Sequence, residues 1–164
     1  MGTPLKLSVC LFALVLLTNM AHAQSKSTPL AGTWRLTEIK STGPNAQTIS
    51  SPQPGLLIFT EKYYSFLIIN SDHARAGLPK REKSSASELL AVWGPFVAAA
   101  GGYEISGSTL ATRPMVAKNP EVMAPGNVQL DRFELQGSTL KLTRIRNGDR
   151  PVANPTTLTF TRLE

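Results

Sequence analysis

Hydrophobic and polar residues alternate in short runs along most of the chain, and Gly, Pro, Asn and Ser residues separate the runs. Alternation with a period of two is typical of β-strands that have one buried face. The pattern predicts strands over 32–40, 55–60, 63–70, 102–106, 109–116, 128–136, 139–146 and 156–163. Eight short strands in this order indicate an all-β fold, an eight-stranded antiparallel barrel.

One segment has the apolar spacing of a helix, between the third and fourth predicted strands. Ser85 and Glu88 have the spacing of a capping box. The apolar residues of the segment are Leu89, Leu90, Val92, Trp93, Phe96 and Val97. We expect Pro95 to kink or divide the helix, because proline removes an internal hydrogen bond, and Gly101 and Gly102 to end it. The helix is expected to cover one end or side of the barrel.

Two segments repeat one hairpin pattern. Residues 103–110 read Tyr-Glu-Ile-Ser-Gly-Ser-Thr-Leu, and residues 133–140 read Phe-Glu-Leu-Gln-Gly-Ser-Thr-Leu. In each, a Gly-Ser pair between two alternating runs predicts a type II′ turn whose glycine supplies the positive φ angle. An internal repeat and the repeated use of one good turn both predict this geometry.

These turns determine which residues lie opposite one another. The second hairpin pairs Leu135 with Leu140, Phe133 with Leu142, Asp131 with Arg144, and Gln129 with Arg146. The first pairs Ile105 with Leu110 and Tyr103 with Thr112. All of these side chains then share the inner face, which is apolar near the turns and polar toward the other end. The alternative is a β-bulge within 130–133, where the alternation is interrupted.

An inner face of this kind predicts a ligand pocket with an apolar base and a few orienting polar groups. The candidate ligand-binding residues are Tyr103, Thr112, Gln129, Asp131, Phe133, Leu142, Arg144 and Arg146. The alternative is structural: inward charges near a rim also form solvated salt bridges or discourage aggregation at strand ends.

The N-terminus has the features of a secretory signal peptide. Lys6 supplies a positive charge, an apolar run follows over 7–17, and Ala21 and Ala23 are the small residues that signal peptidase requires. The run is shorter than the ~20 residues that span a bilayer, so we expect cleavage and no stable membrane anchor. The predicted divisions are a signal peptide over 1–23, a flexible lead over 24–30 and one barrel domain over 31–164, exported to the periplasm or secreted.

Cleavage at this position limits the chemistry of the mature chain. Cys10 and His22 leave with the signal peptide, so no thiol and a single histidine, His73, remain. We therefore expect no disulfide, no zinc site and no cofactor. The chain also has no G-x-S-x-G segment, so a serine hydrolase is not expected.

Charge adds little to this prediction. The formal net charge is +6, which becomes +5 when Lys6 is removed. The basic residues are spread along the chain, with one concentration at His73, Arg75, Lys80, Arg81 and Lys83. This concentration is interpreted as a solvated loop or as an attraction for an anionic ligand or surface. Nucleic acid is not an expected partner, because basic and aromatic residues do not alternate on one face. The oligomeric state is left open.

The residues 32–34, Gly-Thr-Trp, resemble the G-x-W signature of lipocalins, and the wider pattern resembles the lipocalin-like domain family of small calycin-type barrels. Supporting segments are 55–60, 102–104, Asn119-Pro120 followed by Gly126, and 132–135 leading to Leu140. The resemblance covers most of the mature chain and depends on the order of these short segments. The threonine-aspartate signature of lipocalins is not evident.

The resemblance implies structural roles for Gly32, Trp34 and Arg162. In lipocalins the first-strand tryptophan packs against an arginine from the end of the barrel, and Arg162 occupies the matching place on the last predicted strand. A cation–π contact of this kind is worth about 0.5–2 kcal/mol.

The function favoured by these observations is binding of a small hydrophobic or amphipathic molecule inside the barrel, oriented by Arg144, Arg146 or Tyr103. One alternative is a cyclase or isomerase in which Asp131 or Tyr103 transfers a proton and Arg144 stabilises an anion. Another is a non-catalytic interaction module whose barrel is filled by its own side chains. The sequence favours binding over catalysis.

Overall fold

The computed structural model describes residues 28–78 and 83–164. The predicted signal peptide and the first part of the predicted lead lie outside these residues. The strands are β1 (Gly32–Ser41), β2 (Thr48–Ile49), β3 (Gly55–Phe59), β4 (Tyr63–Ile69), β5 (Phe96–Ser106), β6 (Thr109–Ala117), β7 (Gln129–Gln136), β8 (Thr139–Asn147), β9 (Arg150–Pro151) and β10 (Thr156–Arg162). Helix α1 spans Ala86–Trp93, and a short 3-10 helix, η2, spans Pro120–Met123.

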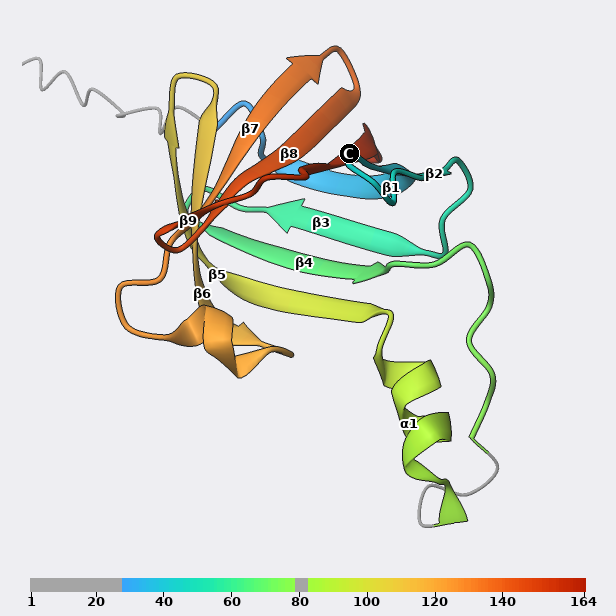
Figure 1. Ribbon diagram of the computed structural model, residues 1–164. Coiled ribbons are helices and arrows are strands. Elements are labelled where there is room, and N and C mark those ends of the chain that lie inside the picture. The colour runs from blue at the N-terminus through green and yellow to red at the C-terminus, as the bar shows by residue number, and fades with distance from the viewer. Residues whose placement is uncertain (1–27, 79–82) are drawn as a thin grey trace, which may run out of the picture.

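The long strands form one closed antiparallel barrel (Figure 1). They pair in the order β1, β3, β4, β5, β6, β7, β8 and β10, and β10 pairs with both β8 and β1. The two-residue strands β2 and β9 pair with β1 and β8. The α-helix of the described residues lies between β4 and β5, the third and fourth of these eight long strands. The predicted fold is therefore confirmed.

The helix is shorter than predicted. Its capping box is present: the Ser85 hydroxyl accepts a hydrogen bond from the Glu88 N–H, and the Glu88 carboxylate accepts one from the Ser85 N–H. The predicted end at Gly101 and Gly102 is wrong, because α1 stops at Trp93. Gly94 is the C-cap and Pro95 follows it, and the next residues pair with β4 as the beginning of β5 instead of continuing the helix.

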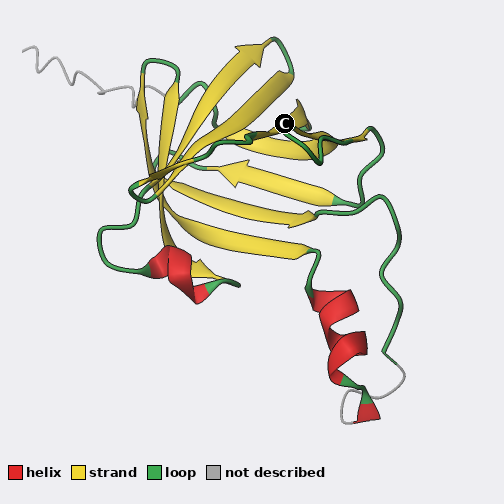
Figure 2. Ribbon diagram, viewed as in Figure 1, coloured by secondary structure: helices red, strands yellow, loops and turns green. Residues whose placement is uncertain are grey.

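The helix also does not cover the barrel in the predicted way. It contributes no buried side chain, and Figure 2 shows it projecting beyond the ends of the strands. The barrel interior is therefore covered by its own strands rather than by α1. No helix within the described residues is long and apolar enough to cross a membrane.

Both Gly-Ser hairpins have the predicted turns. Gly107 and Gly137 each have a φ of +56°, and no non-glycine residue of the described chain has a positive φ. The glycine of each turn therefore has a positive φ and the following serine does not, as a type II′ turn requires. The predicted inner pairs of the first hairpin are present, as are three of the four predicted for the second.

The fourth pair, Gln129 with Arg146, is wrong. The register shifts between Leu130 and Asp131, so that Gln129 lies opposite Asn147 and Leu130 lies opposite Arg146. The cause is a β-bulge, which was the predicted alternative within 130–133.

Trp34 lies at the centre of the core with no exposed surface, and its indole N–H donates to the Leu30 carbonyl oxygen over 2.8 Å. The guanidinium carbon of Arg162 lies 4.0 Å from the centre of the Trp34 ring. Arg162 also donates to the carbonyl oxygens of Pro29 and Ala31. Leu30 is fully buried, which corrects the prediction that it belongs to a flexible lead.

Gly32 is required by its surroundings. Its φ is +125°, and a Cβ atom there would lie 2.2 Å from the Glu164 backbone oxygen. A side chain at this position would therefore displace the end of the chain from the start of β1.

We expect Arg162→Leu to lower the free energy of unfolding by about 2–4 kcal/mol, because the substitution removes the cation–π contact and leaves two carbonyl oxygens without their charged donor. Urea unfolding measures this. The control is Arg113→Leu, which removes an exposed ion pair with Glu104 of 2.9 Å and is expected to change the free energy by less than about 1 kcal/mol. Equal effects of the two substitutions would contradict the structural role of Arg162.

Candidate ligand-binding site

The barrel contains an open cavity of about 350 Å³. Strand alternation directs apolar side chains into it, among them Leu57, Phe59, Phe66, Leu110, Leu142 and Leu158. Phe96 and Lys118 also line it, and they lie at the ends of β5 and β6 away from the Gly107 turn. The cavity therefore extends from the middle of the barrel toward the end opposite the Gly-Ser turns. Its volume is within the range of small-molecule sites.

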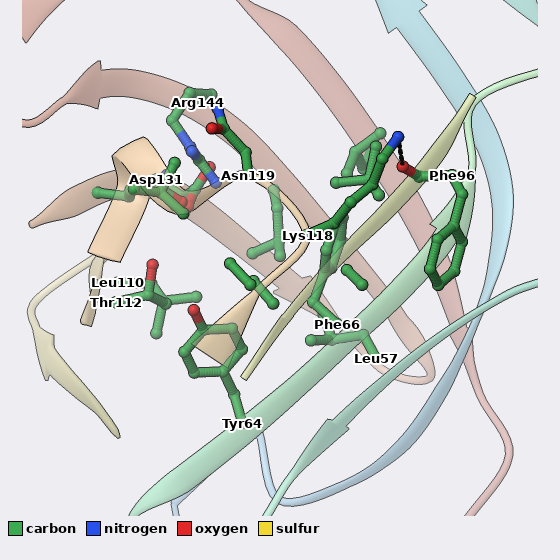
Figure 3. Close-up of a pocket in the computed structure, with 18 of the residues that line it drawn as sticks. Leu57, Tyr64, Phe66, Phe96, Leu110, Thr112, Lys118, Asn119, Asp131 and Arg144 are labelled. Carbon is green, nitrogen blue, oxygen red and sulfur yellow. Dashed lines mark hydrogen bonds and ion pairs between the residues drawn. The ribbon is translucent and has the colours of Figure 1, made fainter. Parts of the chain in front are cut away.

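Four of the polar side chains that line the cavity lie together on one side of it (Figure 3): Tyr64 of β4, Thr112 of β6, Asp131 of β7 and Arg144 of β8. We call them the polar cluster. The Arg144 Nε donates to an Asp131 carboxylate oxygen over 2.8 Å, and a second Arg144 nitrogen donates to the Asn147 side-chain oxygen over 2.9 Å. The Asp131 side chain is only 7% exposed, so its charge is balanced within the barrel wall by Arg144.

Tyr64 is the unusual member of the polar cluster. The residue is 6% exposed, and its buried hydroxyl has no hydrogen-bond partner among the described residues. Burial raises the pKa of the Tyr64 hydroxyl, and the neighbouring Thr112 hydroxyl and the Arg144 charge offset part of this increase. Thr112 is thus close enough to act on Tyr64 electrostatically, although the two hydroxyls do not meet the geometry of a hydrogen bond. Tyr64 is a neutral group with an unused donor.

Lys118, the residue after β6, lines the other side of the cavity (Figure 3). Its ammonium group donates to the carbonyl oxygens of Trp93, Gly94 and Phe96. Trp93 is the last residue of α1 and Gly94 is its C-cap, where backbone carbonyl oxygens lack partners within the helix, and a cation there is favoured by the helix dipole. Phe96 is the first residue of β5. The position of Lys118 is therefore set by the end of the helix.

The structure brings five of the eight predicted ligand-binding residues to the cavity: Thr112, Gln129, Asp131, Leu142 and Arg144. It does not bring Tyr103, Phe133 or Arg146 there.

Each of these three side chains has a local reason to lie elsewhere. The Tyr103 hydroxyl donates to the Thr60 carbonyl oxygen over 2.7 Å. Phe133 packs against the hydrophobic core. Arg146 is exposed beyond the β-bulge, with a nitrogen 3.8 Å from an Asp149 carboxylate oxygen.

Sequence reasoning missed Tyr64, Phe66, Phe96 and Lys118. The first two had a usable signal, because alternation along 63–70 places Tyr64 and Phe66 on the same face as the buried Ile68. Phe96 was assigned to the helix. Lys118 had no such signal, since its role depends on where three carbonyl oxygens come together in space.

Three comparisons relate the chain to known proteins. A family model described as a lipocalin-like domain matches residues 31–163. The chain is similar to the crystal structure of a lipocalin-like protein from Bacteroides uniformis, with 13% identity, a TM-score of 0.44, and coverage of 82% of this chain and 98% of that chain. It is also similar to an uncharacterized protein from Bacteroides eggerthii, with 11% identity, a TM-score of 0.42, and coverage of 81% and 98%. No curated protein matches it.

We expect Tyr64→Phe to raise the free energy of unfolding of the ligand-free protein by about 1 kcal/mol, because the substitution removes a buried hydroxyl that has no partner. Tyr103→Phe is the matched control. It deletes a hydroxyl that is hydrogen-bonded to Thr60, and we expect it to lower the free energy by about 0.5–1 kcal/mol. Urea unfolding of both variants at neutral pH measures the difference, and a loss of stability in Tyr64→Phe would show that its hydroxyl has a partner.

Proposed function

The chain belongs to the lipocalin-like domain family, and we propose that its barrel binds a small hydrophobic or amphipathic molecule in the cavity. One observation carries the proposal: a cavity of about 350 Å³ with a largely apolar wall is also lined by Tyr64, whose buried hydroxyl has no hydrogen-bond partner among the described residues. Apolar walls favour a ligand by removing its surface from water, and a few polar groups orient it.

The size of the cavity limits the ligand. At roughly 30 Å³ for each small group, the cavity has room for about a dozen methylene-sized groups. An apolar body of that size lies against the leucine and phenylalanine side chains, and a polar end lies on the side of Tyr64 and Thr112. This corresponds to a small amphipathic molecule rather than to a large lipid with two long chains.

The alternatives from the sequence receive less support. An interaction module with a filled barrel has no use for an open cavity of this volume. A cyclase or isomerase that used Tyr103 for proton transfer would need that hydroxyl in the cavity, whereas it is bonded to the Thr60 carbonyl oxygen. Asp131 does line the cavity, but there it is paired with Arg144.

Filling the cavity tests the proposal. N-phenyl-1-naphthylamine is an uncharged probe whose fluorescence increases in apolar surroundings, and we expect the protein to bind it. Ala117 lines the cavity, so Ala117→Phe is expected to weaken probe binding by roughly tenfold or more. The control is Val116→Phe, because the neighbouring Val116 is 63% exposed and outside the cavity lining. Equal binding by the two variants, or no binding by the unaltered protein, would count against the cavity as the site.

We also propose that the protein acts outside the cytoplasm, in the periplasm or after secretion. The support is the signal-peptide pattern of residues 1–23. When the full chain is expressed in a bacterium, N-terminal sequencing of the purified protein is expected to begin at Gln24. A product that is recovered from the cytoplasm and still carries residues 1–23 would contradict this.

A further inference from the structure

We propose that the cavity selects ligands whose polar end is uncharged, such as an alcohol, ester or amide, over carboxylates and amines of the same length. The inference rests on the proposed binding function and specifies its ligand class. Three features of the cavity wall carry it: a balanced ion pair, a neutral donor without a partner, and a lysine whose donors are occupied.

The charges in the cavity wall are largely paired. The charged side chains among the described residues that line the cavity are Lys118, Asp131 and Arg144. Asp131 and Arg144 are joined at 2.8 Å and cancel each other's charge. A ligand carboxylate placed beside Arg144 would also lie beside the Asp131 carboxylate, and an ammonium group beside Asp131 would lie beside Arg144. Either charge would be desolvated without gaining an unopposed partner.

Tyr64 supplies what a neutral ligand needs. Its hydroxyl is buried without a partner among the described residues. A ligand oxygen that reaches it therefore forms a hydrogen bond without breaking one within the protein. Burial keeps this hydroxyl protonated at neutral pH, since its pKa lies above the ordinary value. It is therefore a donor, and it suits a hydroxyl, ester or amide oxygen.

Lys118 does not reverse this preference. An ammonium group has three donors, and Lys118 directs them to the carbonyl oxygens of Trp93, Gly94 and Phe96. Figure 3 shows its amino group on the other side of the cavity from the polar cluster. A carboxylate attracted to Lys118 would have to take a donor from these carbonyls, which lie at the end of α1 and the start of β5.

Three probes of one chain length test the selectivity: 1-decanol, decanoate and decylammonium. At about pH 7.5 the acid is ionised and the amine is protonated. Displacement of N-phenyl-1-naphthylamine by each probe gives the three affinities. We expect 1-decanol to bind at least about tenfold more tightly than either ion. Decanoate or decylammonium binding as tightly as 1-decanol would overturn the inference.

Substitution of the ion pair separates charge balance from shape. Asp131→Asn leaves Arg144 unopposed, so we expect the ratio of decanoate to 1-decanol affinity to rise by roughly tenfold. Arg144→Gln leaves Asp131 unopposed, and the ratio of decylammonium to 1-decanol affinity is expected to rise. The control is Glu104→Gln, which alters an exposed ion pair outside the cavity and should change neither ratio. Ratios that stay constant in both cavity variants would exclude the charge-balance explanation.

Tyr64→Phe tests the donor. We expect the variant to bind 1-decanol about three- to tenfold more weakly, while decane, which has no polar end, binds as it does to the unaltered protein. An unchanged 1-decanol affinity would exclude Tyr64 as the donor.

The outcomes distinguish this inference from the function on which it rests. A protein that binds neither the naphthylamine probe nor any decyl compound refutes the binding function and the selectivity together. A protein that binds all the compounds without regard to charge keeps the binding function and refutes the selectivity alone.

Discussion

Closure of the barrel by β10 is the constraint on which the cavity depends. β10 pairs with β1 on one side and with β8 on the other, so β8 and the start of β1 are held in one wall. At that end Arg162 stacks on Trp34, and its backbone N–H donates to the Ser138 carbonyl oxygen in the β7–β8 turn. The same closure that fills this end with Trp34 and Phe160 makes the inner face continuous. The polar cluster can then form across β4 and the three consecutive strands β6, β7 and β8.

The Asp131–Arg144 pair illustrates why stability alone is a poor explanation for the polar wall. A buried ion pair contributes little net stability, because the desolvation of both charges offsets their attraction, and apolar replacements are often as stable. The unpartnered Tyr64 hydroxyl beside it is unfavourable for the empty protein. Two polar arrangements that do little for folding thus lie in one cavity wall. Departures of this kind from good packing are expected where a protein binds a ligand.

The fold and part of the site could be predicted because they depend on local rules. The Gly-Ser turns determine the hairpin register, and that register placed Asp131 opposite Arg144 and Phe133 opposite Leu142. The wrong predictions concern features that depend on contacts between distant parts of the chain or on a local break in the strand register. β4 pairs with 96–102, of which only Gly102 lay in a predicted strand, and the bulge beside Asp131 moves Arg146 out of the inner face. The register also does not predict where along the barrel an inward side chain lies. Phe133 therefore shares the inner face and yet packs against the core rather than along the cavity.

Helix α1 is held at the cavity by polar contacts rather than by burial. Leu90 and Trp93 are 71% and 48% exposed, and the helix contributes no buried side chain. Its N-terminus is capped by Ser85, whereas its C-terminal carbonyls are held by Lys118, and Arg75 donates to the Val92 carbonyl oxygen. Segments with few buried apolar contacts open at a smaller free-energy cost than the core does. Lys118 lines the cavity and also binds the end of this helix. The strands thus determine the shape of the cavity, while the environment of its lysine depends on the least buried element around it.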